Sequence, residues 1–197
     1  MRVAIVKYNA GNIYSVIHAL KRVGVDPVLT DDANILRQAD RVIFPGQGEA
    51  SHAMEYLREH KLDHVIRSLT QPVLGICIGQ QLMCSYSEEG DVDCLDIFHT
   101  NVVRFKPMTH DQKVPHMGWN QLEHIQDKLL EGIDEASFVY FVHSFYVPVC
   151  DSTIATTQHI LPFSAAMRKG NFMSTQFHPE KSGSVGEQIL KNFLGSI

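Results

Sequence analysis

The residue best suited to covalent chemistry is Cys77, which stands between two glycines in the sequence Gly-Ile-Cys-Ile-Gly over 75–79. An apolar run over 72–76 precedes it and a helical pattern follows it, so the segment predicts a sharp strand-to-helix turn. Such a turn leaves little room beside its central residue, which explains the small neighbours. We expect Cys77 to be held at a sheet edge and at a helix start, which stabilises a thiolate. An inert buried cysteine is the alternative, and it is the expectation for the remaining three: Cys84, Cys94 and Cys150.

A base for this nucleophile is offered by His178, which is followed by Pro179 and Glu180. A cysteine nucleophile needs a group that takes and returns a proton, and that group needs a third one to orient it. The segment follows an apolar strand pattern, and residues i and i+2 of an extended segment face the same way. We therefore expect Glu180 to fix the tautomer of His178 and to stabilise its charged form. A surface turn is the alternative.

Oxyanion donors are the next requirement of this chemistry. The backbone N–H of Ile78 follows the nucleophile directly and would point at the developing oxyanion. A second donor is expected from the segment around Gln47 and Gly48, in a glycine-containing loop between a strand and a helix. A plain connecting turn is the alternative for this loop. His143 also stands at a strand end, where a hydrogen-bonded structural residue is the alternative.

The first half of the chain alternates short apolar runs with helical periods. Asn12 is placed to cap the first helix, and this alternation predicts a parallel sheet covered on both faces. Active sites of such sheets collect at the carboxyl ends of the parallel strands. The expected strands are 2–7, 25–29, 41–44 and 72–76, and the expected helices are 13–20, 50–57, 62–69 and 79–86.

The second half has a different pattern of short strands with turn residues between them. A helix returns at the end, where Ser184 and Glu187 have the spacing of a capping box. The fold class expected is α/β, an open, mixed, mainly parallel sheet flanked by helices, with extra antiparallel strands in the second half. The expected strands of this half are 101–105, 121–125, 138–142, 152–157, 163–168 and 172–176.

Composition excludes several classes of function. The 197 residues are 44% hydrophobic and 20% charged, and 17 basic against 22 acidic residues give a net charge of −5. This balance argues against nucleic acid as a partner. No apolar run is long enough to span a membrane, and no CxxC pair, HExxH or glycine-rich phosphate loop is present. We expect a reduced, cytoplasmic protein without a metal or cofactor.

These residues together resemble a known family. The sequence Gly-Ile-Cys-Ile-Gly-Gln-Gln over 75–81, with His-Pro-Glu about a hundred residues later, resembles the class I (triad) glutamine amidotransferases. Further motifs resemble the glutaminase subunits of imidazole glycerol phosphate synthase, and they lie in order over essentially the whole chain. These are Tyr-Asn-Ala-Gly-Asn (8–12), Pro-Gly-Gln-Gly (45–48), Pro-His-Met-Gly-Trp-Asn (115–120), Tyr-Phe-Val-His-Ser (140–144) and His-Pro-Glu-Lys-Ser (178–182).

The resemblance implies a flavodoxin-like fold, a single glutamine amidotransferase domain over 1–197, and a set of residue roles. Cys77, His178 and Glu180 would form the catalytic triad that hydrolyses glutamine to glutamate and ammonia. Gln81 lies one helical turn after the nucleophile and would face the same pocket. By resemblance it contacts glutamine, as does the backbone around His143 and Ser144. The positions that match the subunit interface of the family are Asn12, Trp119 and Lys181.

The resemblance also implies a partner. Family members channel the ammonia to a (β/α)₈-barrel cyclase subunit, which makes imidazole glycerol phosphate and an aminoimidazole carboxamide ribonucleotide in histidine biosynthesis. This predicts a heterodimer. Two alternatives stay open, namely the glutaminase subunit of another triad amidotransferase and a stand-alone cysteine hydrolase. A catalytically silent regulatory subunit is the non-enzymatic alternative.

Overall fold

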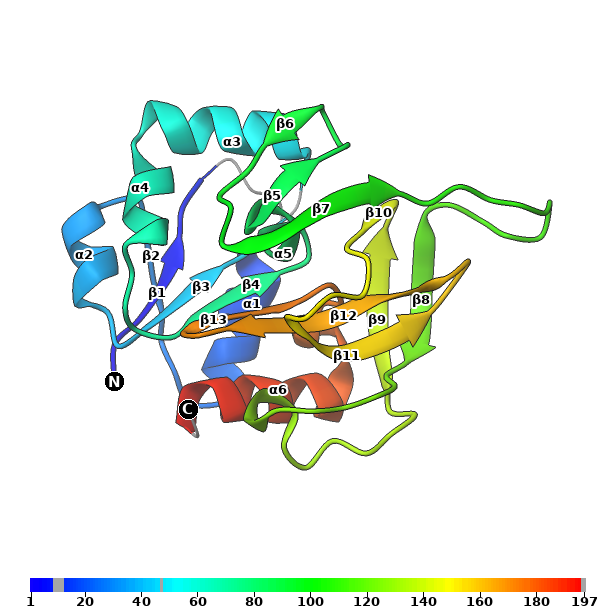
Figure 1. Ribbon diagram of the computed structural model, residues 1–197. Helices are drawn as coiled ribbons and strands as arrows, with labels where there is room; N and C mark the ends of the chain where they lie inside the picture. Colours follow the sequence, from blue (N-terminus) through cyan, green and yellow to red (C-terminus); the bar gives the residue numbers. More distant parts are fainter. Residues whose placement is uncertain (9–12, 47, 196–197) are drawn as a thin grey trace.

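The computed structural model describes residues 1–8, 13–46 and 48–195 (Figure 1). Within these residues, a seven-stranded sheet has the order β11-β12-β13-β4-β3-β1-β2. Neighbours from β13 through β2 are parallel, while β12 and β11 are each antiparallel to the strand before them. The strands are β1 (Val3–Val6), β2 (Val28–Thr30), β3 (Arg41–Phe44), β4 (Val73–Ile76), β11 (Thr153–Gln158), β12 (Pro162–Lys169) and β13 (Phe172–Thr175).

Helices cover both faces of this sheet, with α2, α3 and α4 on one face and α1 and α6 on the other (Figure 1). Strand β1 shows why two cores form, because Ala4 and Val6 face one core while Val3 and Ile5 face the other. The mainly parallel, helix-flanked α/β sheet that the sequence predicts is confirmed. The helices are α1 (Ile13–Arg22), α2 (Ala33–Gln38), α3 (Ala50–Glu59), α4 (Leu62–Arg67), α5 (Ile78–Leu82) and α6 (Gly183–Gly195).

Smaller strands lie beside the central sheet at the end where the parallel strands finish (Figure 1). One group has the order β10-β7-β5-β6, and the other is the antiparallel hairpin of β8 and β9. Their bounds are β5 (Cys84–Ser87), β6 (Val92–Asp93), β7 (Phe98–Arg104), β8 (His116–Gln121), β9 (Phe138–His143) and β10 (Phe145–Tyr146), and the 3₁₀ turns are η1 (Lys128–Leu130) and η2 (Pro179–Lys181).

Several sequence-based boundaries are wrong. The helix expected over 79–86 ends at Leu82, because the chain then pairs as β5 with β7. The strand expected over 121–125 is β8, which ends at Gln121 where the pairing with β9 stops. Ser184 does not cap the last helix, since α6 already begins at Gly183. The cap predicted at Asn12 lies outside the described residues.

Candidate active site

Three neighbouring parallel strands bring the predicted groups to one edge of the sheet. Strand β4 leads directly into Cys77, and β13 on one side of it leads into His178. Strand β3, on the other side, leads into the loop that contains Gly48. Because the carboxyl ends of parallel strands meet at the same edge, residues about a hundred positions apart converge there.

The turn at Cys77 is sharp and strained. The residue has φ 54° and ψ −109°, in the left-handed half of conformational space, and it occupies the N-cap position of α5. A Cβ on Gly79 would lie 2.1 Å from the carbonyl oxygen of Phe44, and one on Gly75 would lie 2.9 Å from the carbonyl of Gly79. The two glycines are therefore required for backbone to pass backbone, as the sequence predicts.

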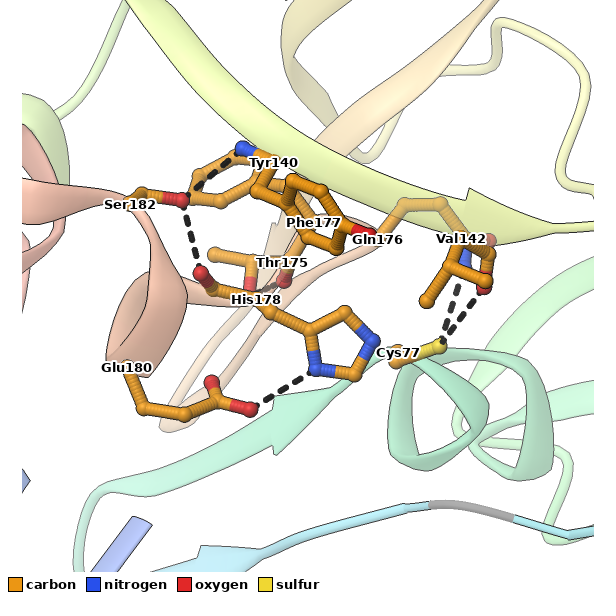
Figure 2. Close-up of polar contacts among 9 residues, drawn as sticks. All are labelled: Cys77, Tyr140, Val142, Thr175, Gln176, Phe177, His178, Glu180 and Ser182. Carbon is orange, nitrogen blue, oxygen red and sulfur yellow. Dashed lines mark hydrogen bonds and ion pairs between the residues drawn. The ribbon is translucent and has the colours of Figure 1, made fainter. Parts of the chain in front are cut away.

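His178 and Glu180 form a buried pair behind the cysteine. Nδ1 of His178 lies 2.8 Å from Oε1 of Glu180, and both side chains are almost fully buried. The other ring nitrogen, Nε2, has no hydrogen-bond partner among the described residues and faces the sulfur of Cys77 in Figure 2. The carboxylate accepts the Nδ1–H, so it fixes the orientation of the ring.

The route by which Glu180 arrives differs from the extended geometry expected from the sequence. His178 is extended, but the next residues form the 3₁₀ turn η2, which brings Glu180 back beneath the ring. Ser182 stabilises this turn, because its hydroxyl donates to the carbonyl of His178 and accepts the N–H of Tyr140. The proximity is as predicted, and the local geometry is corrected.

The electrostatics of the site favour a charged imidazole. Burial alone disfavours the imidazolium, but the attraction of Cys77 and of Glu180 outweighs it and raises the pKa of His178 to about 10. A proton is thus held on the ring that faces the sulfur. This is the arrangement in which a cysteine attacks as a thiolate and a histidine afterwards acts as an acid.

The candidate oxyanion donors lie at the same place. Ile78 is the first residue of α5, so its N–H has no partner within the helix. Gly48 has φ +125° and lines the cavity with Ile78, whereas Gln47 lies outside the described residues. A Cβ on Gly46 would lie 1.9 Å from Cγ2 of Ile78, so glycine lets this loop approach the helix.

A cavity of about 410 Å³ opens over the sulfur. Its volume and mixed lining suit a small polar molecule such as an amino acid. The predicted site residues that line it are Gly48, Cys77, Ile78, Gln81, His143, Ser144, His178 and Lys181.

The predicted substrate residues differ in what they offer to this cavity. Nε2 of Gln81 donates to the carbonyl of Phe145 and to Oε1 of Gln176, both at 2.9 Å. The ring of His143 is directed into the interior, with Nδ1 2.7 Å from the carbonyl of Phe145 and Nε2 3.0 Å from Nδ1 of His116. Burial lowers the pKa of His143 to about 3, so its ring is neutral.

Two residues at the site were not found by sequence reasoning. Glu89 lines the cavity, and burial raises the pKa of its carboxyl despite a hydrogen bond from the N–H of Ala50. Gln176 is fully buried, and its Nε2 lies 3.7 Å from Sγ of Cys77. The available signal was a polar residue at the end of the apolar run over 172–176, immediately before the predicted base.

The residues predicted at a subunit interface lie beside the mouth of the cavity. Trp119 is 56% exposed, and its ring meets the ring of Tyr140 edge-on. Nζ of Lys181 lies 6.0 Å from the centre of the same tyrosine ring, at cation–π distance. Met117, two residues before Trp119 on β8, is also exposed. Asn12 lies outside the described residues.

The described part of the chain holds neither a metal cluster nor a membrane-spanning helix. Among residues 1–8, 13–46 and 48–195, no group of three or more His, Cys, Asp or Glu side chains is placed to hold a metal ion. Within the same ranges, no helix is long and apolar enough to cross a membrane.

Comparison with known proteins identifies the family. The family model for class-I glutamine amidotransferases matches residues 4–197. The imidazole glycerol phosphate synthase protein HisH of Bacteroides thetaiotaomicron is 62% identical over 98% of this chain and 99% of its own length. The protein of the same name from Pectobacterium atrosepticum is 44% identical over 98% and 99%.

Solved structures agree with the fold. The crystal structure of a protein from Thermoplasma acidophilum, described as part of a GMP synthase, superimposes with a TM-score of 0.75. It covers 99% of this chain and 93% of its own, at 20% identity. From the sequence match and these relatives together, the chain belongs to the class-I glutamine amidotransferases, in the family whose curated members are named imidazole glycerol phosphate synthase subunit HisH.

Proposed function

We propose that this chain is the glutaminase subunit of imidazole glycerol phosphate synthase. It hydrolyses glutamine to glutamate and ammonia, and the ammonia passes to a (β/α)₈-barrel cyclase subunit in histidine biosynthesis. The names of the relatives support this assignment. The observation that carries the chemistry is the strained Cys77, with Nε2 of His178 facing its sulfur and Glu180 behind the ring.

The first half-reaction removes ammonia. The thiolate of Cys77 attacks the side-chain carbonyl carbon of glutamine, a C–S bond forms, and the carbonyl electron pair moves onto oxygen. The N–H of Ile78 and the loop at Gly48 hold this oxyanion. When the oxyanion collapses, the C–N bond breaks, and the imidazolium of His178 protonates the departing nitrogen. Ammonia leaves, and a glutamyl thioester stays on the sulfur.

The second half-reaction releases glutamate. His178 is now neutral and takes a proton from a water molecule, which attacks the thioester carbonyl. The same donors hold the second oxyanion, and the C–S bond breaks when it collapses. The sulfur leaves as thiolate and His178 carries the proton again, so the starting charges are restored. Glu180 stabilises the imidazolium at both ends of the cycle.

Glutamine also needs recognition of its α-ammonium and α-carboxylate groups. Glu89 is the acidic side chain among the residues described as lining the cavity, and its carboxylate is suited to the α-ammonium group. Gln81 lines the wall near the sulfur. Because burial raises the pKa of Glu89, a bound cation beside it would stabilise the ionised carboxylate.

The partner is assigned to the exposed face next to the cavity mouth. Trp119 and Met117 expose apolar surface there, with Lys181 nearby on η2. Exposed aromatic side chains are enriched among the residues that contribute most to protein interfaces. A barrel docked on this face would cover the cavity mouth, where ammonia is released.

The test is the release of glutamate in the presence of the cyclase subunit. Cys77→Ala should lower the rate by at least about a thousandfold, because it removes the nucleophile. Cys150→Ser is the matched control, since Cys150 is half-buried and lies outside this cavity. Equal rates for the wild type and Cys77→Ala would contradict the proposal. Full activity without the cyclase subunit, on amides other than glutamine, would favour a stand-alone cysteine hydrolase.

A further inference from the structure

A buried side-chain amide lies against the nucleophile from the side away from the base. Nε2 of Gln176 lies 3.7 Å from Sγ of Cys77, within hydrogen-bond distance for sulfur. The residue is fully buried and follows β13 directly, two positions before His178. Figure 2 shows its side chain meeting the sulfur on a different side from the imidazole ring.

The orientation of this amide is determined by its neighbours. The carbonyl of Phe145 can only accept, so the group of Gln81 that lies 2.9 Å from it must be the NH₂. The second hydrogen of that NH₂ is donated to the side chain of Gln176, whose facing atom must therefore be oxygen. It follows that Gln176 presents its NH₂, and not its oxygen, to the sulfur of Cys77.

The same carbonyl also orders a chain of histidines. His143 donates its Nδ1–H to Phe145, so its Nε2 must accept from the Nδ1–H of His116. Nε2 of His116 then accepts from the NH₂ of Asn120. The other hydrogen of that NH₂ goes to the carbonyl of Gln158, which closes the chain with an acceptor.

Both histidines are neutral in this arrangement. Burial lowers the pKa of His116 to about 4, as it lowers that of His143. The shared carbonyl of Phe145 is thus approached from two sides by donors whose direction does not reverse at neutral pH. Gln81 and Gln176 are held in one orientation as a result.

We propose that Gln176 is a further catalytic residue, which donates a hydrogen bond to the thiolate of Cys77 and so keeps the sulfur ionised and correctly placed for attack. The inference deepens the proposed function, on which it rests for the identity of the reaction. A hydrogen bond to an ionised acceptor is stronger than one to its neutral form. The amide therefore favours the thiolate over the thiol.

The thiol form has a competing partner. Sγ of Cys77 lies 3.9 Å from the carbonyl oxygen of Val142 on β9, which can accept an S–H proton but repels a thiolate. Gln176 opposes this carbonyl, because it offers a donor to the ionised sulfur. The titratable groups that interact electrostatically with Cys77 are His178, which Glu180 contacts, and Tyr8. The variants below leave all three unchanged.

The test measures the sulfur directly. Iodoacetamide alkylates a thiolate, with formation of an S–C bond and loss of iodide, and mass spectrometry isolates the rate at Cys77 from that of the other cysteines. Gln176→Leu removes both amide groups, while Gln176→Glu keeps the acceptor for Gln81 and removes the donor. In both variants we expect the midpoint of the alkylation profile to rise by about one pH unit, a tenfold effect of ~1.4 kcal/mol.

Gln80→Leu is the matched control. Gln80 is a fully buried glutamine of α5, but its side chain contacts Ser164 and Ser174. We expect its alkylation profile to match that of the wild type. Unchanged midpoints in Gln176 variants that melt cooperatively would overturn the inference and leave Gln176 a packing residue.

A second measurement needs no variant of Gln176. In the wild-type chain labelled with ¹⁵N, the side-chain amide protons of Gln176 should move downfield with the alkylation midpoint as Cys77 ionises. Protons that do not move would also overturn the inference. Neither readout uses glutamine, so a chain with the expected alkylation shifts but no glutaminase activity would contradict the proposed function alone.

Discussion

The proton on His178 belongs to both the stability and the chemistry of the chain. Its ring is buried against Glu180, and the folded state holds its pKa at about 10, above the ordinary value of 6.5. A group whose pKa rises on folding stabilises the folded state in its protonated form. This stabilisation is complete below about pH 6.5, where the unfolded chain is also protonated, and it is lost as the pH rises through about 10.

Glu180→Gln tests this linkage. The substitution keeps an oxygen acceptor for Nδ1 of His178 but removes the negative charge, so it should lower the free energy of unfolding by about 2 kcal/mol near pH 6. The difference from the wild type should shrink as the pH rises towards 10. Denaturant unfolding at several pH values measures it.

The control is Glu187→Gln on α6, where an exposed carboxylate pairs with Lys191. It should show no comparable pH-dependent difference from the wild type. A gap for Glu180→Gln that stays constant from pH 6 to pH 10 would argue against a protonated His178 in the folded chain.

At the scale of single residues, sequence predicts groups that carry chemistry better than groups that assist them. Cys77 stands out because of its glycines, and His178 because Glu180 follows two positions later. Gln176 gives no comparable signal, since its function depends on the contact that Gln81 makes with it across the fold. Such contacts follow from tertiary packing, which spacing along the chain does not encode.

At the scale of elements, the site depends on how closely α5 approaches β3. The backbone of Gly79 passes the carbonyl of Phe44 so closely that a Cβ would lie 2.1 Å from its oxygen. Both groups are backbone, so neither can rotate away. The glycine therefore determines the position of α5, which begins directly after Cys77.

Gly79→Ala should destabilise the chain by at least about 3 kcal/mol, because β3 and α5 must move apart. For a chain of this length, that corresponds to a fall in melting temperature of roughly 6 to 12 °C. Gly195→Ala at the end of α6 is the matched control, since a Cβ there meets nothing within 4 Å. Thermal unfolding followed by circular dichroism compares the two. A Gly79→Ala chain that melts with the wild type would show that the contact is not tight in solution.

The same region shows where prediction of elements from sequence fails. The strand–turn–helix around Cys77 was predicted because both flanking patterns are local. The end of α5 at Leu82 was not, because residues 84–87 become strand β5 only by pairing with β7, where Cys84 aligns with Phe98. A short apolar run is compatible with helix or strand until its pairing partner is known.

At the scale of the whole molecule, the hairpin of β8 and β9 joins the exposed face to the active site. Alternate residues of β8 face opposite ways, so Met117 and Trp119 are exposed while His116 is buried in the hydrogen-bonded chain that ends at Phe145. Tyr140 is paired with Trp119 on the neighbouring strand. A partner that docks on this face therefore contacts the strand that carries His116.

Trp119→Ala tests the docking face. Truncation of an exposed aromatic anchor should weaken binding of the cyclase subunit by about 2 kcal/mol or more, a roughly 30-fold rise in Kd. The melting temperature of the isolated chain should barely change, because the indole is more than half exposed. Ile35→Ala is the control, since Ile35 is exposed on α2 beside the start of β1, where Arg2 and Val3 line a small hollow at the opposite end of the sheet strands. Titration calorimetry with the cyclase subunit compares both variants with the wild type. Equal weakening by the two substitutions, or none by either, would place the partner elsewhere, and the hydrogen-bonded chain behind β8 would then act on Cys77 without being covered by the partner.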